Sequence, residues 1–180
     1  RPPSDSLKAN LRALALFQLT YPGSPMIFYG DEAGMWGGPY PDNVKPMLWP
    51  EFVYDYETYA TIRPDLRDEV AVRFDRKLFH AYRSVNKVRH NYPALRKGSF
   101  VPRLIDDQRD VYVFSRIFEK NEMVVFLNNS DEKQDVGYDV QKKDGAKVKD
   151  VLNDRNFIVK NGHITVPLQK KWGAILVKSK

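Results

Sequence analysis

The chain has 180 residues, of which 42% are hydrophobic and 29% charged, as in a folded globular protein with room for one good core or two small ones. It has no cysteine and no apolar run of about 18 residues, which excludes disulfides, thiolate metal sites and a transmembrane helix from this sequence. Most of the net charge of +6 comes from residues 94–180, whose 17 basic and 12 acidic residues are interspersed, so we expect solvated strand edges and no nucleic-acid or membrane partner.

A helix is predicted at the start of the chain. Large apolar residues recur there at roughly helical spacing: Leu7, Leu11, Leu14 and Phe17. Ser4 and Ser6 are both suitable N-caps, and the Tyr-Pro-Gly sequence at residues 21–23 would end the helix. The sequence therefore predicts a helix followed by a tight turn.

Residues 26–29, Met-Ile-Phe-Tyr, predict a buried strand after that turn. A short apolar run without polar alternation is typical of a strand covered on both faces, as in the parallel sheets of α/β proteins. Gly30 ends the run, and Asp31 and Glu32 follow it. Because chemistry in such folds lies at the carboxyl ends of strands, we expect these acids to lie at a candidate site.

The segment 14–49 resembles the α-amylase family, glycoside hydrolase family 13, and in particular its neopullulanase, cyclomaltodextrinase and maltogenic amylase branch. The resemblance rests on Leu-Thr-Tyr-Pro-Gly-Ser-Pro-Met-Ile-Phe-Tyr-Gly-Asp-Glu at residues 19–32 and on Lys-Pro-Met-Leu-Trp at residues 45–49. It implies that residues 26–29 are the last strand of a TIM (β/α)8 barrel. It also implies a retaining hydrolase of α-glucans such as starch, pullulan, cyclodextrin or maltooligosaccharides.

The same resemblance implies that no catalytic residue lies in this chain. The family's nucleophile, general acid and third carboxylate belong to earlier strands, and its Asn-His-Asp signature is absent from the residues that begin Arg1-Pro2-Pro3. A complete barrel needs about 250 residues. We therefore expect a C-terminal fragment that is inactive alone and whose unpaired strand favours self-association. No cofactor or metal is expected in it, and calcium, compartment and oligomeric state of the parent stay open.

Residues 33–64 are predicted to form a long loop rich in aromatic residues, glycine and proline, and loops of this length are usually functional. Sugars present apolar faces and hydroxyl rims, so a sugar site needs flat aromatic platforms beside carboxylates. Trp49, Phe52 and Tyr54 are expected instead to pack the loop onto the barrel. The candidate substrate-binding residues are Tyr29, Asp31, Met35, Trp36, Tyr40 and Asp42.

The chain departs from the resembled branch at two positions, Tyr40 and Val44. Relatives in the resembled branch carry an Asp-Pro-x-x-Arg motif that contacts a glucose ring, whereas this chain has Tyr40 and Val44 at the charged positions. We expect an altered chain-length or linkage specificity, because a charged clamp is replaced by a stacking face.

Asp31 and Glu32 are neighbours whose side chains point apart on an extended strand, so both a substrate-side and a structural role remain open for Asp31.

A second amphipathic helix is predicted from about residue 67 to residue 91, started by Pro64 and Asp65. Its apolar positions are Val70, Phe74, Leu78, Tyr82, Val85 and Val88. The resemblance makes it the last helix of the barrel. His80 and His90 lie on different faces of such a helix, which argues against a metal-binding pair.

After Leu95 the apolar period changes to two, which predicts strands at residues 111–118, 123–127 and 172–177. Asn161-Gly162 predicts a type I′ hairpin between residues 157–160 and 163–166. The overall prediction is α/β plus all-β: the last helix-strand-helix part of a TIM barrel in residues 1–93, followed by an antiparallel β-sandwich C-terminal domain in residues 94–180.

Three functions stay open at this point. The first is the C-terminal part of a retaining glucan hydrolase whose partner is an α-glucan oligosaccharide. The second is a freestanding carbohydrate-binding module, which would bind maltooligosaccharides without cleaving them. The third is a structural β-domain, which would do neither. The order of the Gly-Asp-Glu and Pro-Met-Leu-Trp motifs favours the first.

Overall fold

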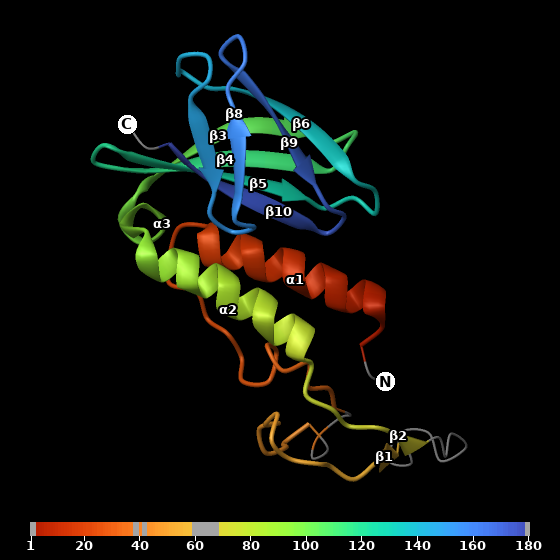
Figure 1. Cartoon of the computed structure of the whole chain (residues 1–180). Helices are drawn as coiled ribbons and strands as arrows, with labels where there is room; N and C mark the ends of the chain where they lie inside the picture. Colours follow the sequence, from red (N-terminus) through yellow and green to blue (C-terminus); the bar gives the residue numbers. More distant parts are fainter. Residues whose placement is uncertain (1–2, 38–39, 41–42, 59–68, 179–180) are drawn as a thin grey trace.

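The computed structural model of this chain describes residues 3–37, 40, 43–58 and 69–178. A layer of helices lies below a β-domain, and the segment between the first two helices hangs below that layer (Figure 1). This order confirms the prediction of a helical part followed by an antiparallel β-domain. Within the described residues, no helix is long and apolar enough to cross a membrane.

The described residues form three helices, α1 (Asp5–Thr20), α2 (Arg76–Asn91) and α3 (Pro93–Lys97). The strands of the lower segment are β1 (Glu57–Thr58) and β2 (Glu69–Val70). Those of the β-domain are β3 (Ser99–Asp106), β4 (Val111–Phe118), β5 (Asn121–Asn128), β6 (Gln134–Asp139), β7 (Lys147–Asp150), β8 (Arg155–Ile158), β9 (His163–Leu168) and β10 (Trp172–Lys178).

Helix α1 begins and ends close to its predicted limits. Ser4 is the N-cap, and its side chain accepts a hydrogen bond from the Leu7 amide at 3.2 Å, which satisfies one of the free donors of the first turn. The buried side chains of the helix are Ala15, Leu16, Leu19 and Thr20. Leu7 and Leu14 are half exposed, so the buried stripe runs one to two positions beyond the predicted one.

The expected burial of residues 26–29 is not met within this chain. In the segment 24–29, called the extended segment below, residues 24–28 form neither helix nor strand, and they pair with no strand among the described residues. Met26 is 78% exposed and Phe28 65% exposed. An apolar run is buried only where neighbouring strands and helices cover it, and no described strand lies beside this segment.

Helix α2 ends at Asn91 as predicted, but its predicted start at residue 67 is wrong. The helix begins at Arg76, where Asp75 is the N-cap and accepts a hydrogen bond from the Leu78 amide at 2.9 Å. Glu69 and Val70 instead form β2, which pairs with β1. Pro64 and Asp65, the expected start signal, lie outside the described residues.

The β-domain is a sandwich of two antiparallel sheets, which confirms the predicted fold class. Its strand orders are β3-β4-β5-β10-β7-β8 and β6-β9. Between the sheets, Val113 and Phe126 of the larger sheet join Val136 and Val166 of the smaller one in a single buried cluster. Alternating side chains of the same strands point to the opposite face of the larger sheet, where the helices lie.

The predicted hairpin around Asn161-Gly162 is only partly present. Both residues have positive φ angles, 51° and 71°, as a type I′ turn requires, and Lys160 and His163 form an isolated bridge. Beyond that bridge the two strands separate, because β8 pairs with β7 and β9 pairs with β6. The turn therefore connects the two sheets of the sandwich.

Helices α1 and α2 cover the outer face of the larger sheet. Leu16 and Val85 of the helices and Phe114 and Ile175 of the sheet are fully buried in one cluster. Gly173 of β10 allows this close packing, because a Cβ atom there would overlap the carbonyl oxygen of Phe126 and lie 2.7 Å from Leu16 Cδ2. The helical layer and the sandwich thus share a hydrophobic core.

Candidate functional site

The candidate site lies in the turn that follows residues 24–29. The amides of Ala33 and Met35 donate to the carbonyl of Gly30 at 3.1 and 2.9 Å, and the amide of Asp31 donates to that of Phe28 at 3.1 Å. Gly30 has a φ of 93°, and a Cβ atom there would crowd the Met35 side chain. The glycine is therefore what allows the chain to turn at once after the extended segment.

The two adjacent carboxylates face different surroundings. Glu32 accepts a hydrogen bond from the Gly30 amide at 3.1 Å, so one oxygen helps to hold the turn. Burial, and then the negative charge of Glu32, raise the pKa of Asp31. Burial and the two carboxylates also raise the pKa of Tyr82 on α2. The negative charges of Asp31 and Glu32 therefore disfavour the charged form of Tyr82.

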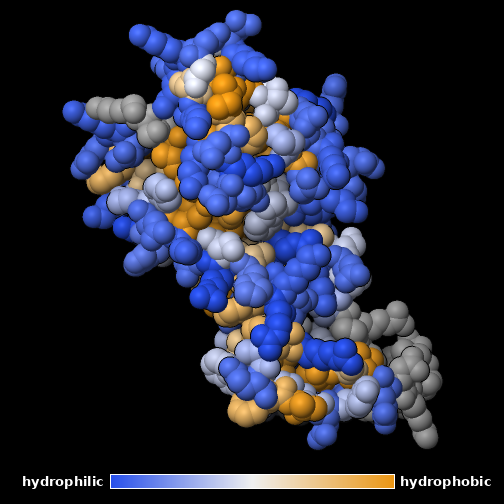
Figure 2. Space-filling model, in the orientation of Figure 1, coloured by the Kyte–Doolittle hydropathy of each residue, from blue (hydrophilic) through white to orange (hydrophobic). Residues whose placement is uncertain are grey.

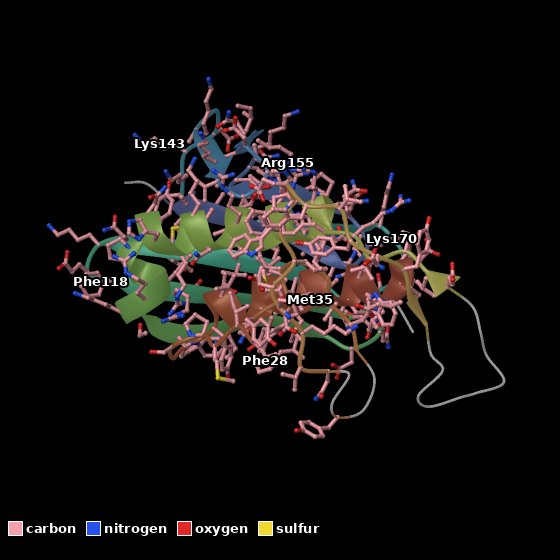
Figure 3. All side chains as sticks on the ribbon, turned by 90° about the horizontal axis from the view of Figure 1, so that it is seen from below. Phe28, Met35, Phe118, Lys143, Arg155 and Lys170 are labelled. Atoms are coloured by element: carbon pink, nitrogen blue, oxygen red, sulfur yellow. The ribbon has the colours of Figure 1, made fainter. Side chains whose placement is uncertain are left out.

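Side chains of the extended segment alternate between two open hollows. Met26 and Phe28 line a hollow of about 540 Å³ against α1, which Asp31 and Tyr82 also line. Ile27 and Tyr29 line a second hollow of about 390 Å³ against α2. Figure 3 views the side of the helical layer that faces away from the β-domain and labels Phe28 and Met35 there. The segment thus has the alternation of a strand without strand neighbours.

Lys45 joins two of the predicted site residues. Its ammonium donates to the carbonyl of Trp36 at 2.9 Å, lies 4.7 Å from the centre of the Trp36 ring and pairs with Glu57. The hydroxyl of Tyr29 donates to the Lys45 carbonyl at 2.8 Å. The sequence reasoning missed Lys45, because a single lysine in a loop carries no local signal of such a role.

Met35 and Trp36 are half-buried, in a small cluster around Ala33, Leu48 and Val72. They help to hold the loop together. Figure 2 shows apolar residues gathered on the lower lobe, to which this loop belongs. The loop therefore has a core of its own, separate from that of the helices and the sandwich.

The predicted aromatic platform is only partly described. Tyr40 is 82% exposed, which leaves its ring free to stack, whereas Asp42 lies outside the described residues. Tyr54 packs within the loop itself, where its hydroxyl bonds with the backbone of Trp49. The expected packing of Trp49 and Phe52 is wrong for this chain, because they are 52% and 65% exposed.

No metal site is formed in the described ranges, where no group of three or more histidine, cysteine, aspartate or glutamate side chains converges. His80 and His90 are both exposed on α2. The chemistry available at the candidate site is hydrogen bonding by Asp31, Glu32 and Tyr82 and stacking by exposed aromatic rings.

Comparisons with known proteins show that the chain is similar to parts of alpha-amylases and neopullulanases. Residues 102–176 match the family model of the alpha-amylase C-terminal domain. Neopullulanase 2 of Thermoactinomyces vulgaris is 32% identical over 169 residues, which are 94% of this chain and 26% of that protein. The chain therefore spans about a quarter of the length of this relative.

Solved structures share the fold. An Anoxybacillus alpha-amylase superposes with a TM-score of 0.72 at 24% identity, over 94% of this chain and 32% of its own. AmyP, solved in complex with maltose, superposes with a TM-score of 0.69 at 16% identity, over 97% of this chain and 35% of its own. Both matches take in the helical part together with the β-domain.

Proposed function

Because this chain belongs to the α-amylase family and corresponds to the C-terminal portion of its neopullulanase-like members, we propose that it is part of a retaining glycoside hydrolase of α-glucans. The single observation that carries the proposal is the alignment of 94% of the chain with neopullulanase 2. That alignment takes in the Gly30-Asp31-Glu32 turn as well as the β-domain. A match limited to residues 102–176 would support a mobile accessory domain equally well.

We propose the same two domains that the sequence predicts. Residues 1–93 supply the last helix-strand-helix part of a barrel, and residues 94–180 supply the C-terminal sandwich. The extended segment at residues 24–29 supports this, because its alternating side chains and two open hollows suit a strand that has parallel neighbours elsewhere. The short helix α3 (Pro93–Lys97) lies at the proposed boundary.

The substrate side of the site is proposed to consist of Tyr29, Asp31, Met35, Trp36, Tyr40 and Asp42. Tyr40 offers a free aromatic face, and Asp31 a carboxylate that accepts hydrogen bonds from sugar hydroxyls. The ligand class is an α-glucan oligosaccharide, in keeping with the maltose bound to AmyP.

The chain itself is proposed to be catalytically inactive. A retaining mechanism needs two carboxyl groups about 5–5.5 Å apart that face one glycosidic bond. Asp31 and Glu32 are consecutive, and Glu32 already accepts the Gly30 amide, so this pair is suited to holding the turn and the substrate. The acid and the nucleophile would be supplied from outside these 180 residues.

The reading frame that encodes Arg1 tests the proposal. Three strand-end carboxylates upstream, the last in an Asn-His-Asp context, would support a hydrolase, and the full product should release sugar from pullulan or starch while the 180-residue chain does not. A start codon directly before Arg1 would contradict it.

A second candidate is a freestanding carbohydrate-binding module, which the exposed rings of Tyr40, Trp49 and Phe52 favour. Such a module would bind maltotriose in calorimetry with the 180-residue chain alone. Titration of that chain with maltotriose therefore separates the two functions.

A further inference from the structure

Two buried arginines lie where the helical layer meets the β-domain. Arg89 of α2 is 8% exposed and Arg116 of β4 is 1% exposed. Neither has a carboxylate partner in the part of the chain that the structure describes, and both donate to main-chain carbonyl groups instead. Buried charges are ordinarily paired with an opposite charge, so this arrangement needs an explanation.

The carbonyls that the arginines hold come from the ends of two helices and the turn beyond one of them. Arg89 donates to Leu19 at 2.9 Å, Leu95 at 2.8 Å and Gly23 at 2.7 Å. Arg116 donates to Thr20 at 2.7 Å, Leu95 at 3.1 Å and Gly98 at 2.9 Å. The two guanidinium groups thus share the Leu95 carbonyl and together hold five carbonyl groups.

Helix chemistry explains why cations are held here. The last four carbonyls of a helix lack intrahelical partners, and the partial negative charge at that end attracts cations. The last turn of α1 has no basic residue of its own, so Arg89 and Arg116 supply the positive charge from other elements. Figure 1 shows the C-terminal ends of α1 and α2 side by side next to α3, where these contacts lie.

Three of these carbonyls, those of Leu19, Thr20 and Gly23, lie directly before the segment 24–29 that leads to the candidate site. Gly23 ends the turn after α1, with a φ of 105°, and residues 24–29 run from it directly to Asp31. The side chain of Gln18 also donates to the carbonyl of Met26. The position from which the segment leaves α1 is thereby fixed by side chains of α1, α2 and β4.

We infer that Arg116 is a positioning residue through which a strand of the β-domain, together with Arg89, sets where the segment bearing Asp31 leaves α1. The β-domain then acts on the candidate site through a defined contact and not only by covering apolar surface. That the segment serves a glucan site rests on the proposed function, whereas the positioning itself does not.

The test is amide hydrogen exchange of the 180-residue chain, read residue by residue by NMR. The variants are Arg116→Met, Arg116→Lys and Arg89→Met. Arg103→Met is the matched control, because Arg103 is an arginine of the neighbouring strand that donates to Ser115 at 2.8 Å and pairs with Glu122 at 2.7 Å, away from α1.

Three sets of amides report the stability of three different parts of the chain. Tyr21 donates to the Phe17 carbonyl at the end of α1, and Ala33 and Met35 lie in the turn after Asp31. Amides of β5, in the middle of the larger sheet, report the global stability of the sandwich. Exchange rates do not depend on glucan binding, so failure of the proposed function leaves this readout unchanged.

We expect Arg116→Met and Arg89→Met to speed exchange at Tyr21 by roughly tenfold to a hundredfold, as for the loss of charged hydrogen bonds. Exchange at Ala33 and Met35 should rise in the same direction, with β5 and the Arg103→Met variant unchanged. Arg116→Lys keeps the charge but not the planar fork, so its effect should be smaller, and it keeps the test open if Arg116→Met does not fold. A uniform rise at all amides, or a rise at Tyr21 alone, would overturn the inference.

Discussion

The ammonium of Lys8 lies 2.9 Å from Oδ2 of Asp75 and ties the first turn of α1 to the N-cap of α2. Asp75 also accepts the Leu78 amide with its other oxygen, and its own amide donates to the Ala33 carbonyl at 2.9 Å. One residue therefore connects both helices and the turn that carries the candidate site.

The first prediction is that this connection weakens in acid. Burial disfavours the charged form of Asp75, but the hydrogen bond and charge of Lys8 and the amides of the first turn outweigh it, so its pKa is lowered. A carboxyl group with a lowered pKa stabilises the fold above its ordinary pKa, about 3.9. That contribution is lost as the pH falls through the lowered value.

Asp75→Asn is the variant that measures it, because asparagine is an equally good N-cap but carries no charge. At pH 7 we expect a loss of about 0.5 kcal/mol in the free energy of unfolding by urea. The difference from the unmodified chain should disappear as the pH falls below about 4 and Asp75 itself becomes protonated. A difference that stays constant down to pH 2 would show that the charge of Asp75 does not contribute.

The second prediction concerns Asp150, which is fully buried at the end of β7. Its carboxylate accepts the amides of Leu152, Asn153 and Ile175 and pairs with Arg155 at 2.8 Å. Asp150→Asn would turn an acceptor into a donor that faces the Arg155 guanidinium. We expect a loss of about 3 kcal/mol, the low end for a broken buried pair because the Arg155 side chain is 33% exposed.

Urea denaturation followed by circular dichroism checks this, with Asp154→Asn as the control. Asp154 pairs with Lys149, but both side chains are largely exposed, so that substitution should have no measurable effect. Equal effects of the two substitutions would contradict the assignment of Asp150 as the centre of this network.

The third prediction compares two glycines that matter for different reasons. Gly173→Ala would push β10 away from Phe126 and Leu16, and we expect a loss of about 3 kcal/mol, the upper end for overpacking a core. Gly23→Ala meets no atom within 4 Å and costs only the strain of a φ of 105°, about 1 kcal/mol. Thermal denaturation of both variants should therefore show the larger drop in Tm for Gly173→Ala.

Local sequence signals predicted the elements well where the local chain decides them. The end of α1 follows from Tyr21-Pro22-Gly23, and the turn at Asn161-Gly162 follows from residues that tolerate positive φ. The separation of β8 and β9 into two sheets could not be predicted in this way, because it depends on which distant strand each one meets.

The wrong start predicted for α2 and the missed role of Lys45 also come from contacts between distant residues. Val70 and Phe74 continue the apolar period of α2, yet Val70 pairs in β2 and the capping side chain of Asp75 starts the helix. In the candidate site, the sequence predicted that the apolar run ends at Gly30 but not the role of Lys45, whose contacts with Trp36 and Glu57 exist only after the loop folds. Long-range contacts decided each of these cases.

The fourth prediction concerns specificity in an intact enzyme that contains this chain. Val44 and Tyr40 are exposed. The resemblance to the neopullulanase branch implies that they stand where that branch has a charged clamp. Tyr40→Asp combined with Val44→Arg should restore charged hydrogen bonds to a glucose ring and change the distribution of products from pullulan or maltooligosaccharides. Chromatography of the products checks this, and an unchanged distribution would exclude these positions from the glucan site.

The last prediction is that the 180-residue chain associates with itself through residues 24–29. Their backbone lacks strand partners among the described residues, and Phe28 presents an exposed apolar ring on the same segment. Such an edge is a template for pairing with another extended chain. Phe28→Lys places a charge on it and should shift the sedimentation profile toward the monomer. Ile105→Lys is the matched control, because Ile105 is 67% exposed but lies on β3 in the β-domain. A chain that is monomeric at all concentrations, or that responds equally to both substitutions, would contradict association through this segment.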